Sequence, residues 1–192
     1  MSKTRLEAFS DGVIAILITI MVLEFKVPPG PDLPALRSML PVFLSYVLSF
    51  VFLGIYWNNH HHMLHAAEKV DGRILWANLH LLFWLSLVPI GTEWIGNYPF
   101  ARLPTAVYGV ILLCAALAYT ILQATIVRRH GPDSLLASAV GRDSKGKLSL
   151  GLYVAAIGAA FLLPWISYVL YILVALIWLV PDRRIEKKLH PS

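Results

Sequence analysis

Four histidines lie within six consecutive positions at the end of an apolar stretch, as His60, His61, His62 and His65. Imidazole nitrogens bind zinc and copper, and His61 and His65 are one helical turn apart, a spacing that can chelate a metal. No cysteine or carboxylate lies within the cluster, however. A polar helix end explains the same pattern without a metal. We therefore expect a hydrogen-bonded helix end and no cofactor, with metal binding as the alternative.

Ser10 and Asp11 form a second polar group, near the start of the first apolar stretch. A carboxylate at this depth is costly unless it faces protein or water. Asn78 belongs to a third group, at the start of the third apolar stretch. The topology argued below brings the three groups to one side of the membrane. We therefore expect Ser10 and Asp11 to find partners among His60, His61 and Asn78.

The first apolar stretch also carries an aliphatic stripe, formed by Ile16, Ile20 and Leu23. A helix turns ~100° per residue, which places these three side chains within about 60° of one another. Asp11 lies roughly 140° away from this stripe. Taken alone, such a stripe meets lipid or another helix.

Sequence signatures of enzymes are absent: the chain has no HExxH, no Gly-x-Ser-x-Gly, no phosphate-binding loop and no cysteine pair. It also has neither the spaced arginines of a voltage sensor nor the Thr-Val-Gly-Tyr-Gly filter of familiar potassium channels. We expect a protein that is not an enzyme.

The composition places these residues in a membrane protein. Of 192 residues, 58% are hydrophobic and 14% charged, with a mean hydropathy of +0.68. A soluble domain has about 45–50% apolar and roughly 25% charged residues. The net charge of +5 is confined to short segments between apolar stretches, so no nucleic acid is expected as a partner, and the lipid bilayer is.

Six stretches approach the ~20 apolar residues that a membrane-spanning helix needs. The sequence thus predicts an all-α chain forming one six-helix subunit over residues 1–192, with spans at 9–27, 41–57, 74–95, 103–127, 148–163 and 165–180. The last two are separated by Pro164 and have basic residues on both flanks. Like-charged flanks belong on one side, so a tight helical hairpin is favoured over one kinked helix.

Basic residues predict the orientation. With six spans, 13 of the 16 Lys and Arg residues fall on the side that holds both termini, and only Lys26, Arg37 and Arg102 fall on the other. Positive residues favour the cytoplasmic side, so both termini are expected there. The basic side holds Lys3, Arg5, Lys69, Arg73, Arg128, Arg129, Arg142, Lys145, Lys147, Arg183, Arg184, Lys187 and Lys188.

Three segments together resemble the transmembrane protein 175 family. The first is Arg5-x-x-x-Phe9-Ser10-Asp11 at the start of the first helix. The second is Trp57-x-x-His60-His61, and the third is VDGRILWANL, which contains Asn78. The resemblance covers most of the chain, although its specific motifs lie in the first half.

This resemblance implies a potassium-permeable cation channel assembled as a homotetramer, in which four first helices line the pore. In the family the pore narrows at aliphatic side chains beginning five positions after the signature aspartate, and the matching positions here are Ile16, Ile20 and Leu23. Thr19 matches a hydroxyl residue linked to selectivity. A single repeat of this length is similar to bacterial members, which implies a bacterial plasma membrane.

We expect the constriction to be a dry aliphatic sleeve that blocks ions by dewetting. Arg5, Phe9, Ser10 and Asp11 would hold the first helix in place instead of touching the ion. One alternative is a small secondary transporter or proton-coupled carrier that uses Asp11 and His60 as a relay. A membrane subunit without transport activity is another.

Overall fold

The computed structural model describes residues 2–179, apart from 68, 132–133, 135–136 and 138–142. Within this part of the chain all regular elements are helices, which confirms the predicted all-α class. In chain order they are α1 (Lys3–Leu23), α2 (Leu33–Ser38), α3 (Leu40–His65), α4 (Gly72–Ser86), α5 (Val88–Asn97), α6 (Arg102–His130), α8 (Ser144–Leu162) and α9 (Pro164–Leu179).

Five spans among the described residues are long and apolar enough to cross a membrane: α1, α3, α4 together with α5, α6 and α8. The described part of α9 is apolar but has only 16 residues. A sixth span at residues 165–180 therefore stays a prediction, and Val180 lies outside the described residues. Arg142, Arg183, Arg184, Lys187 and Lys188 of the charge pattern also lie outside them.

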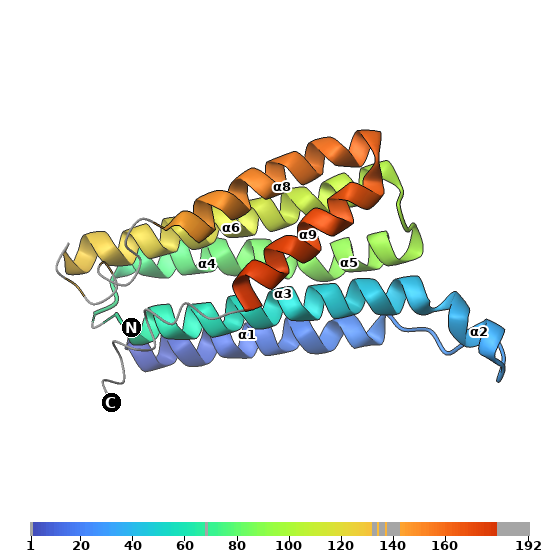
Figure 1. Cartoon of the computed structure of the whole chain (residues 1–192). Helices are drawn as coiled ribbons and strands as arrows, with labels where there is room; N and C mark the ends of the chain where they lie inside the picture. Colours follow the sequence, from blue (N-terminus) through green and yellow to red (C-terminus); the bar gives the residue numbers. More distant parts are fainter. Residues whose placement is uncertain (1, 68, 132–133, 135–136, 138–142, 180–192) are drawn as a thin grey trace, which may run out of the picture.

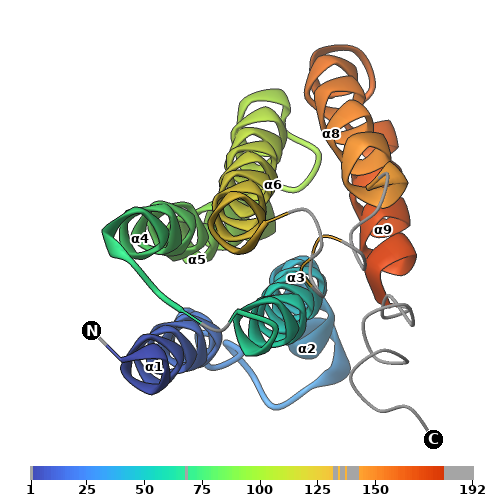
Figure 2. The same cartoon turned by 90° about the vertical axis from the view of Figure 1, so that its left-hand side faces the viewer.

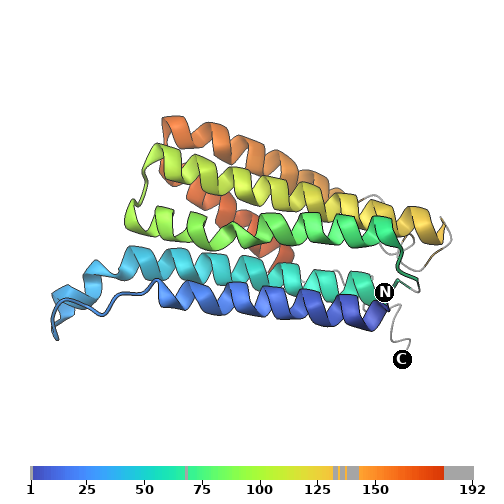
Figure 3. The ribbon, with the colours of Figure 1, turned by 180° about the vertical axis from the view of Figure 1, so that it is seen from behind.

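The first helix is shifted relative to the predicted span 9–27. It starts at Lys3 and stops at Leu23. Pro28 and Pro29 follow closely, and a proline disfavours the α conformation of the residue before it. The connection to α3 contains the short helix α2, whose first turn is capped by Asp32 through a 3.0 Å bond from the Ala35 amide. In Figures 1 and 3 this helix lies beyond the end of the bundle.

The predicted span 74–95 is divided into two helices at Leu87. Pro89 has no backbone N–H and cannot donate to the carbonyl of Leu85, four residues earlier, so the regular ladder is interrupted there. The two helices keep nearly the same direction, and together they form one span, Gly72–Asn97.

The predicted hairpin around Pro164 is present. α8 ends at Leu162, and α9 starts at Pro164 and runs back along it (Figure 1). The Ser167 hydroxyl donates to the carbonyl of Ala156 at 2.6 Å, which joins the two helices near the turn.

The helices form an elongated bundle in which chain direction alternates. α1, α4 and α8 begin, and α3 and α6 end, at the same end of the bundle as the N-terminus (Figures 1 and 2). We call it the basic end, because it carries most of the described Lys and Arg residues, whereas Lys26, Arg37 and Arg102 lie near the opposite end. Those at the basic end are Lys3, Arg5, Lys69, Arg73, Arg128, Arg129, Lys145 and Lys147.

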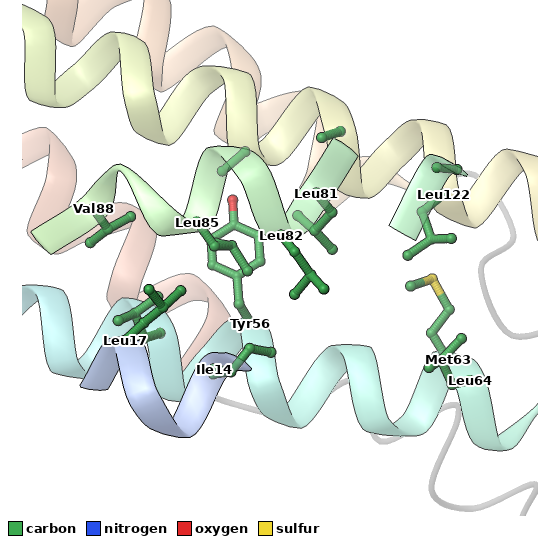
Figure 4. Close-up of a cluster of buried hydrophobic side chains, with 14 of the residues drawn as sticks. Ile14, Leu17, Tyr56, Met63, Leu64, Leu81, Leu82, Leu85, Val88 and Leu122 are labelled. Carbon is green, nitrogen blue, oxygen red and sulfur yellow. The ribbon is translucent and has the colours of Figure 1, made fainter. Parts of the chain in front are cut away.

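Two buried clusters hold the bundle together. The first joins α1, α3, α4 and α6, and Figure 4 shows Ile14 and Leu17 of α1 beside side chains of α3 and α4. The second joins α3, α6, α8 and α9 around Tyr108 and Tyr171, whose rings meet edge to face at 5.5 Å. Among the described residues, the main contacts of α1 are with α3, α4 and α5.

Candidate functional site

One face of α1 is buried in the chain's own core and the predicted stripe is not. The buried face consists of Leu6, Ser10, Ile14, Leu17 and Met21. The stripe residues Ile16, Ile20 and Leu23 are 61%, 43% and 79% exposed in the single chain. The stripe lies about 110° around the helix from the buried face. The fold therefore leaves this aliphatic surface for another partner, whether lipid or protein.

A buried chain of hydrogen bonds fixes α1 to two other helices. Asn78 of α4 donates through Nδ2 to the Ser10 hydroxyl of α1 at 2.9 Å, and Ser10 in turn donates to the carbonyl of Leu6. The other end of the Asn78 amide, Oδ1, lies 2.6 Å from Nε2 of His60 on α3. Because an amide oxygen only accepts, Nε2 of His60 carries the proton. All three polar side chains are almost fully buried.

Asp11 is held by a different partner. The indole Nε1 of Trp57 donates to its Oδ1 at 3.0 Å, in an exposed contact between α1 and α3. Trp57 belongs to the Trp57-x-x-His60-His61 segment noted in the sequence, but it was not predicted to be the donor to Asp11. This pairing could have been predicted, because the indole N–H of a tryptophan at membrane depth needs a hydrogen-bond acceptor and the Asp11 carboxylate offers one.

His61 lies outside the buried hydrogen-bond chain. Its ring is exposed and stacks between Trp57 and His65, with centroids 6.2 Å from each. Arg5 is exposed on the first turns of α1, and Phe9 is 49% exposed. The predicted roles of these residues in packing α1 therefore depend on surfaces outside the single chain.

Thr19 lies on α1 beside the stripe, about 60° around the helix from Ile16. It is exposed, and its hydroxyl lies 3.0 Å from the carbonyls of both Ala15 and Ile16. The hydroxyl proton is thus satisfied within the helix, and the oxygen retains lone pairs that can accept or coordinate.

The first turn of α1 is tied to the last turn of α3. Nζ of Lys3 donates to the carbonyl of His65 at 2.8 Å and lies 3.9 Å from a carboxylate oxygen of Glu7. A cation at a helix C-terminus also offsets the negative end of the helix dipole. Among the described residues, no group of three or more His, Cys, Asp or Glu side chains is placed to hold a metal.

Comparison with known proteins identifies the family. Residues 5–89 match the family model described as endosomal/lysosomal potassium channel TMEM175. Over its full 192 residues the chain is 57% identical to a potassium channel of Chryseobacterium sp. (strain P1-3), covering all of both chains. The chain belongs to the TMEM175 family. It is also 34% identical over 168 residues to a potassium channel of Streptomyces collinus, covering 82% of each.

The fold agrees with a TMEM175 structure. The crystal structure of a lysosomal potassium-selective channel TMEM175 homolog from Chamaesiphon minutus matches with a TM-score of 0.82 at 29% identity, covering 94% of this chain and 97% of that one. TMEM175 proteins are channels, so the chain is not an enzyme, as predicted. The matched segment, residues 5–89, contains every site residue that the sequence predicts.

Proposed function

We propose that the protein is a potassium channel in which α1 helices from four copies surround a shared pore, narrowed by rings of Ile16, Ile20 and Leu23. The observation that carries the proposal is the exposed aliphatic stripe on a helix whose buried face, about 110° away, is fixed by hydrogen bonds. The potassium channel names of the full-length relative and of the Streptomyces relative support the choice of ion.

The position of α1 suits a helix that meets its own copies. Viewed along the bundle, α1 lies at one corner, with α3 and α4 beside it and α8 and α9 on the far side (Figure 2). One helix cannot enclose a pore, and identical subunits usually assemble with closed cyclic symmetry. Four copies around an axis would let the stripes face one another across a narrow lumen. Four is also the number that the family resemblance implies.

The stripe has the chemistry of a hydrophobic constriction. Seven residue steps separate Ile16 from Leu23, roughly 10 Å along a helix at ~1.5 Å per residue. Aliphatic rings narrower than a hydrated ion exclude water and block conduction, so opening requires dilation or rotation of α1. Selectivity in such a pore depends on the cost of dehydration, which is lower for potassium than for sodium, and on the oxygen of Thr19 at the edge of the stripe.

In this proposal the polar residues position α1 and do not contact the ion. Ser10 faces the core, and Asp11 lies ~140° from the stripe. The charge pattern supports a bacterial plasma membrane orientation with the basic end in the cytoplasm, where both termini would lie. The carrier alternative needs a relay between Asp11 and His60, but these bond to different partners, Trp57 and Asn78.

Recording from purified protein in planar bilayers tests the proposal. We expect unitary currents with potassium more permeant than sodium, and a raised baseline current for Ile16→Asn because a polar side chain hydrates the sleeve. Val154→Asn on α8 is the matched control, since Val154 is 59% exposed but far from α1. Saturable, coupled flux without unitary currents would instead identify a carrier.

Oligomeric mass is measured on the same sample. The detergent-corrected mass should be about four times the 21.4 kDa of one chain. A monomer that still conducts ions would rule out the shared pore.

A further inference from the structure

A pocket lies on the side of α3 that faces away from α1. It opens between α3, α6, α8 and α9, and its empty space is about 520 Å³ when the part open to solvent is included. None of its described lining residues comes from α1, so it is separate from the Ile16 stripe. Asn59 lines the pocket and directly precedes His60 on α3. The pocket is therefore next to the Ser10–Asn78–His60 hydrogen-bond chain that holds α1.

Aromatic rings make up much of the lining. Phe52 and Tyr153 are each 2% exposed and pack against each other at 6.4 Å between centroids. Tyr119 contacts both Tyr56 and Trp178 edge to face, at 6.2 and 6.5 Å. Pockets lined by aromatic side chains with few polar groups are typical of small-molecule sites.

The lining carries one formal charge among the described residues, the carboxylate of Asp143. Asp143 precedes the first turn of α8 at the basic end, and its Oδ1 accepts from the Gly146 amide at 3.1 Å. This bond caps the helix without removing the negative charge. Lys145 and Lys147 follow in the same turn but are not among the described lining residues.

We propose that this pocket binds a monovalent organic cation with an aromatic or aliphatic body, such as an arylalkyl ammonium. The negative faces of the rings of Tyr56, Tyr119 and Trp178 attract a cation, most strongly when it is desolvated. Asp143 supplies the opposite charge at the edge of the pocket, and Phe52 and Tyr153 offer an apolar interior for the body. Among the described lining residues there is no positive charge for an anion, and a neutral molecule would make no use of the carboxylate of Asp143.

Equilibrium binding of benzyltrimethylammonium to the purified full chain in detergent tests the proposal. Neopentylbenzene is the matched neutral probe, because it has the same shape without the charge. We expect one cation per chain, and binding of the neutral probe at least about tenfold weaker.

Two variants report on the named contacts. Asp143→Asn should weaken cation binding about 1.5- to 5-fold, the typical range for exposed ion pairs. Asparagine caps helices as well as aspartate does and tolerates the positive φ of 38° at this position, so the variant should fold. Trp178→Leu should weaken binding about tenfold. The control is Asp32→Asn, which alters the cap of α2 at the opposite end and should leave binding unchanged.

Three outcomes would overturn the proposal. Equal affinity for the neutral probe would show an apolar site, such as one for a lipid chain. One cation per assembly, or affinity unaffected by Asp143→Asn, would place the cation elsewhere, for example on the channel axis. Absence of saturable binding would also refute it. If Trp178→Leu fails to fold, Asp143→Asn still decides the result.

Discussion

Asn78 is the residue through which α1 is fixed to both α3 and α4, so Asn78→Leu should destabilise the chain more than its size suggests. Its amide makes two buried bonds, to Ser10 and to His60. Leucine has a similar volume and higher apolarity, so the packing loss is small. The main effect is on the partners left behind.

The magnitude follows from what each partner loses. Ser10 keeps its own donation to the carbonyl of Leu6, so it is left with an unused acceptor only. His60 is 1% exposed and loses the acceptor for its Nε2 proton, which costs about 1–3 kcal/mol for a buried donor. Adding the two bonds, at about 0.6 kcal/mol each inside a membrane protein, gives a total of about 2–4 kcal/mol.

A double-mutant cycle measures this effect as a free energy of unfolding in mixed detergent–SDS micelles at fixed protein concentration. His60→Leu removes the unpaired donor, so adding it to Asn78→Leu should cost much less than either change alone, with a coupling of about 1–2 kcal/mol. Asn97→Leu is the matched control. Asn97 is exposed and bonds only within its own helix, to the carbonyl of Glu93, so it should change stability by less than about 0.5 kcal/mol.

Additive costs in this cycle, or an Asn78→Leu effect no larger than that of Asn97→Leu, would refute the reasoning. Either result would mean that the Ser10–Asn78–His60 chain does not hold α1.

Three further predictions concern assembly, packing and metals. Asp11→Ala, which removes the acceptor of Trp57, should lower the yield of tetramer on size exclusion, and the tetramers that form should keep wild-type ion selectivity; an altered selectivity would place Asp11 in the pore. Gly109→Ala should reduce folded yield, because a Cβ there would overlap the Tyr171 hydroxyl and lie 2.9 Å from Ile157, at an overpacking cost of about 1–3 kcal/mol. Adding Tyr171→Phe should partly restore the folded yield. Gly158→Ala, with open space at its Cβ, should be neutral. Chelator treatment should leave stability unchanged and elemental analysis should find no stoichiometric zinc or copper, whereas a metal retained at one per chain would assign the His61–His65 pair as a ligand site.

Much of the fold follows from the sequence, because the length of the apolar stretches and the positions of the basic residues between them are strong physical signals. The all-helical class, the hairpin at Pro164 and the grouping of Ser10, His60 and Asn78 at one level all rest on them. The residues at which helices end or are interrupted were harder to predict. A hydrophobic window continues through Val27, but the chain leaves the helix at Leu23 before two prolines. The hydrophobicity of the predicted span 74–95 likewise does not reveal the interruption at Pro89.

Side-chain pairing was the least predictable part of the site. Asp11 had several candidate partners at the same depth, and spacing along one helix does not say which donor on a neighbouring helix comes within 3 Å. In the structure Asp11 accepts from Trp57 and His61 is exposed, because the rotation of α3 turns His60 inward and His61 outward. That rotation is set by packing between helices, which a single sequence encodes only indirectly.

Thiol accessibility during bilayer recording tests the central claim most directly. In a Cys114→Ala background, Ile16→Cys, Ile20→Cys and Leu23→Cys channels should lose current when a water-soluble cationic thiol reagent is added, because each side chain faces the shared pore. Val154→Cys on α8, equally apolar and 59% exposed, should show no change of current. If the three α1 positions behave like Val154, the stripe faces lipid and α1 does not line the pore.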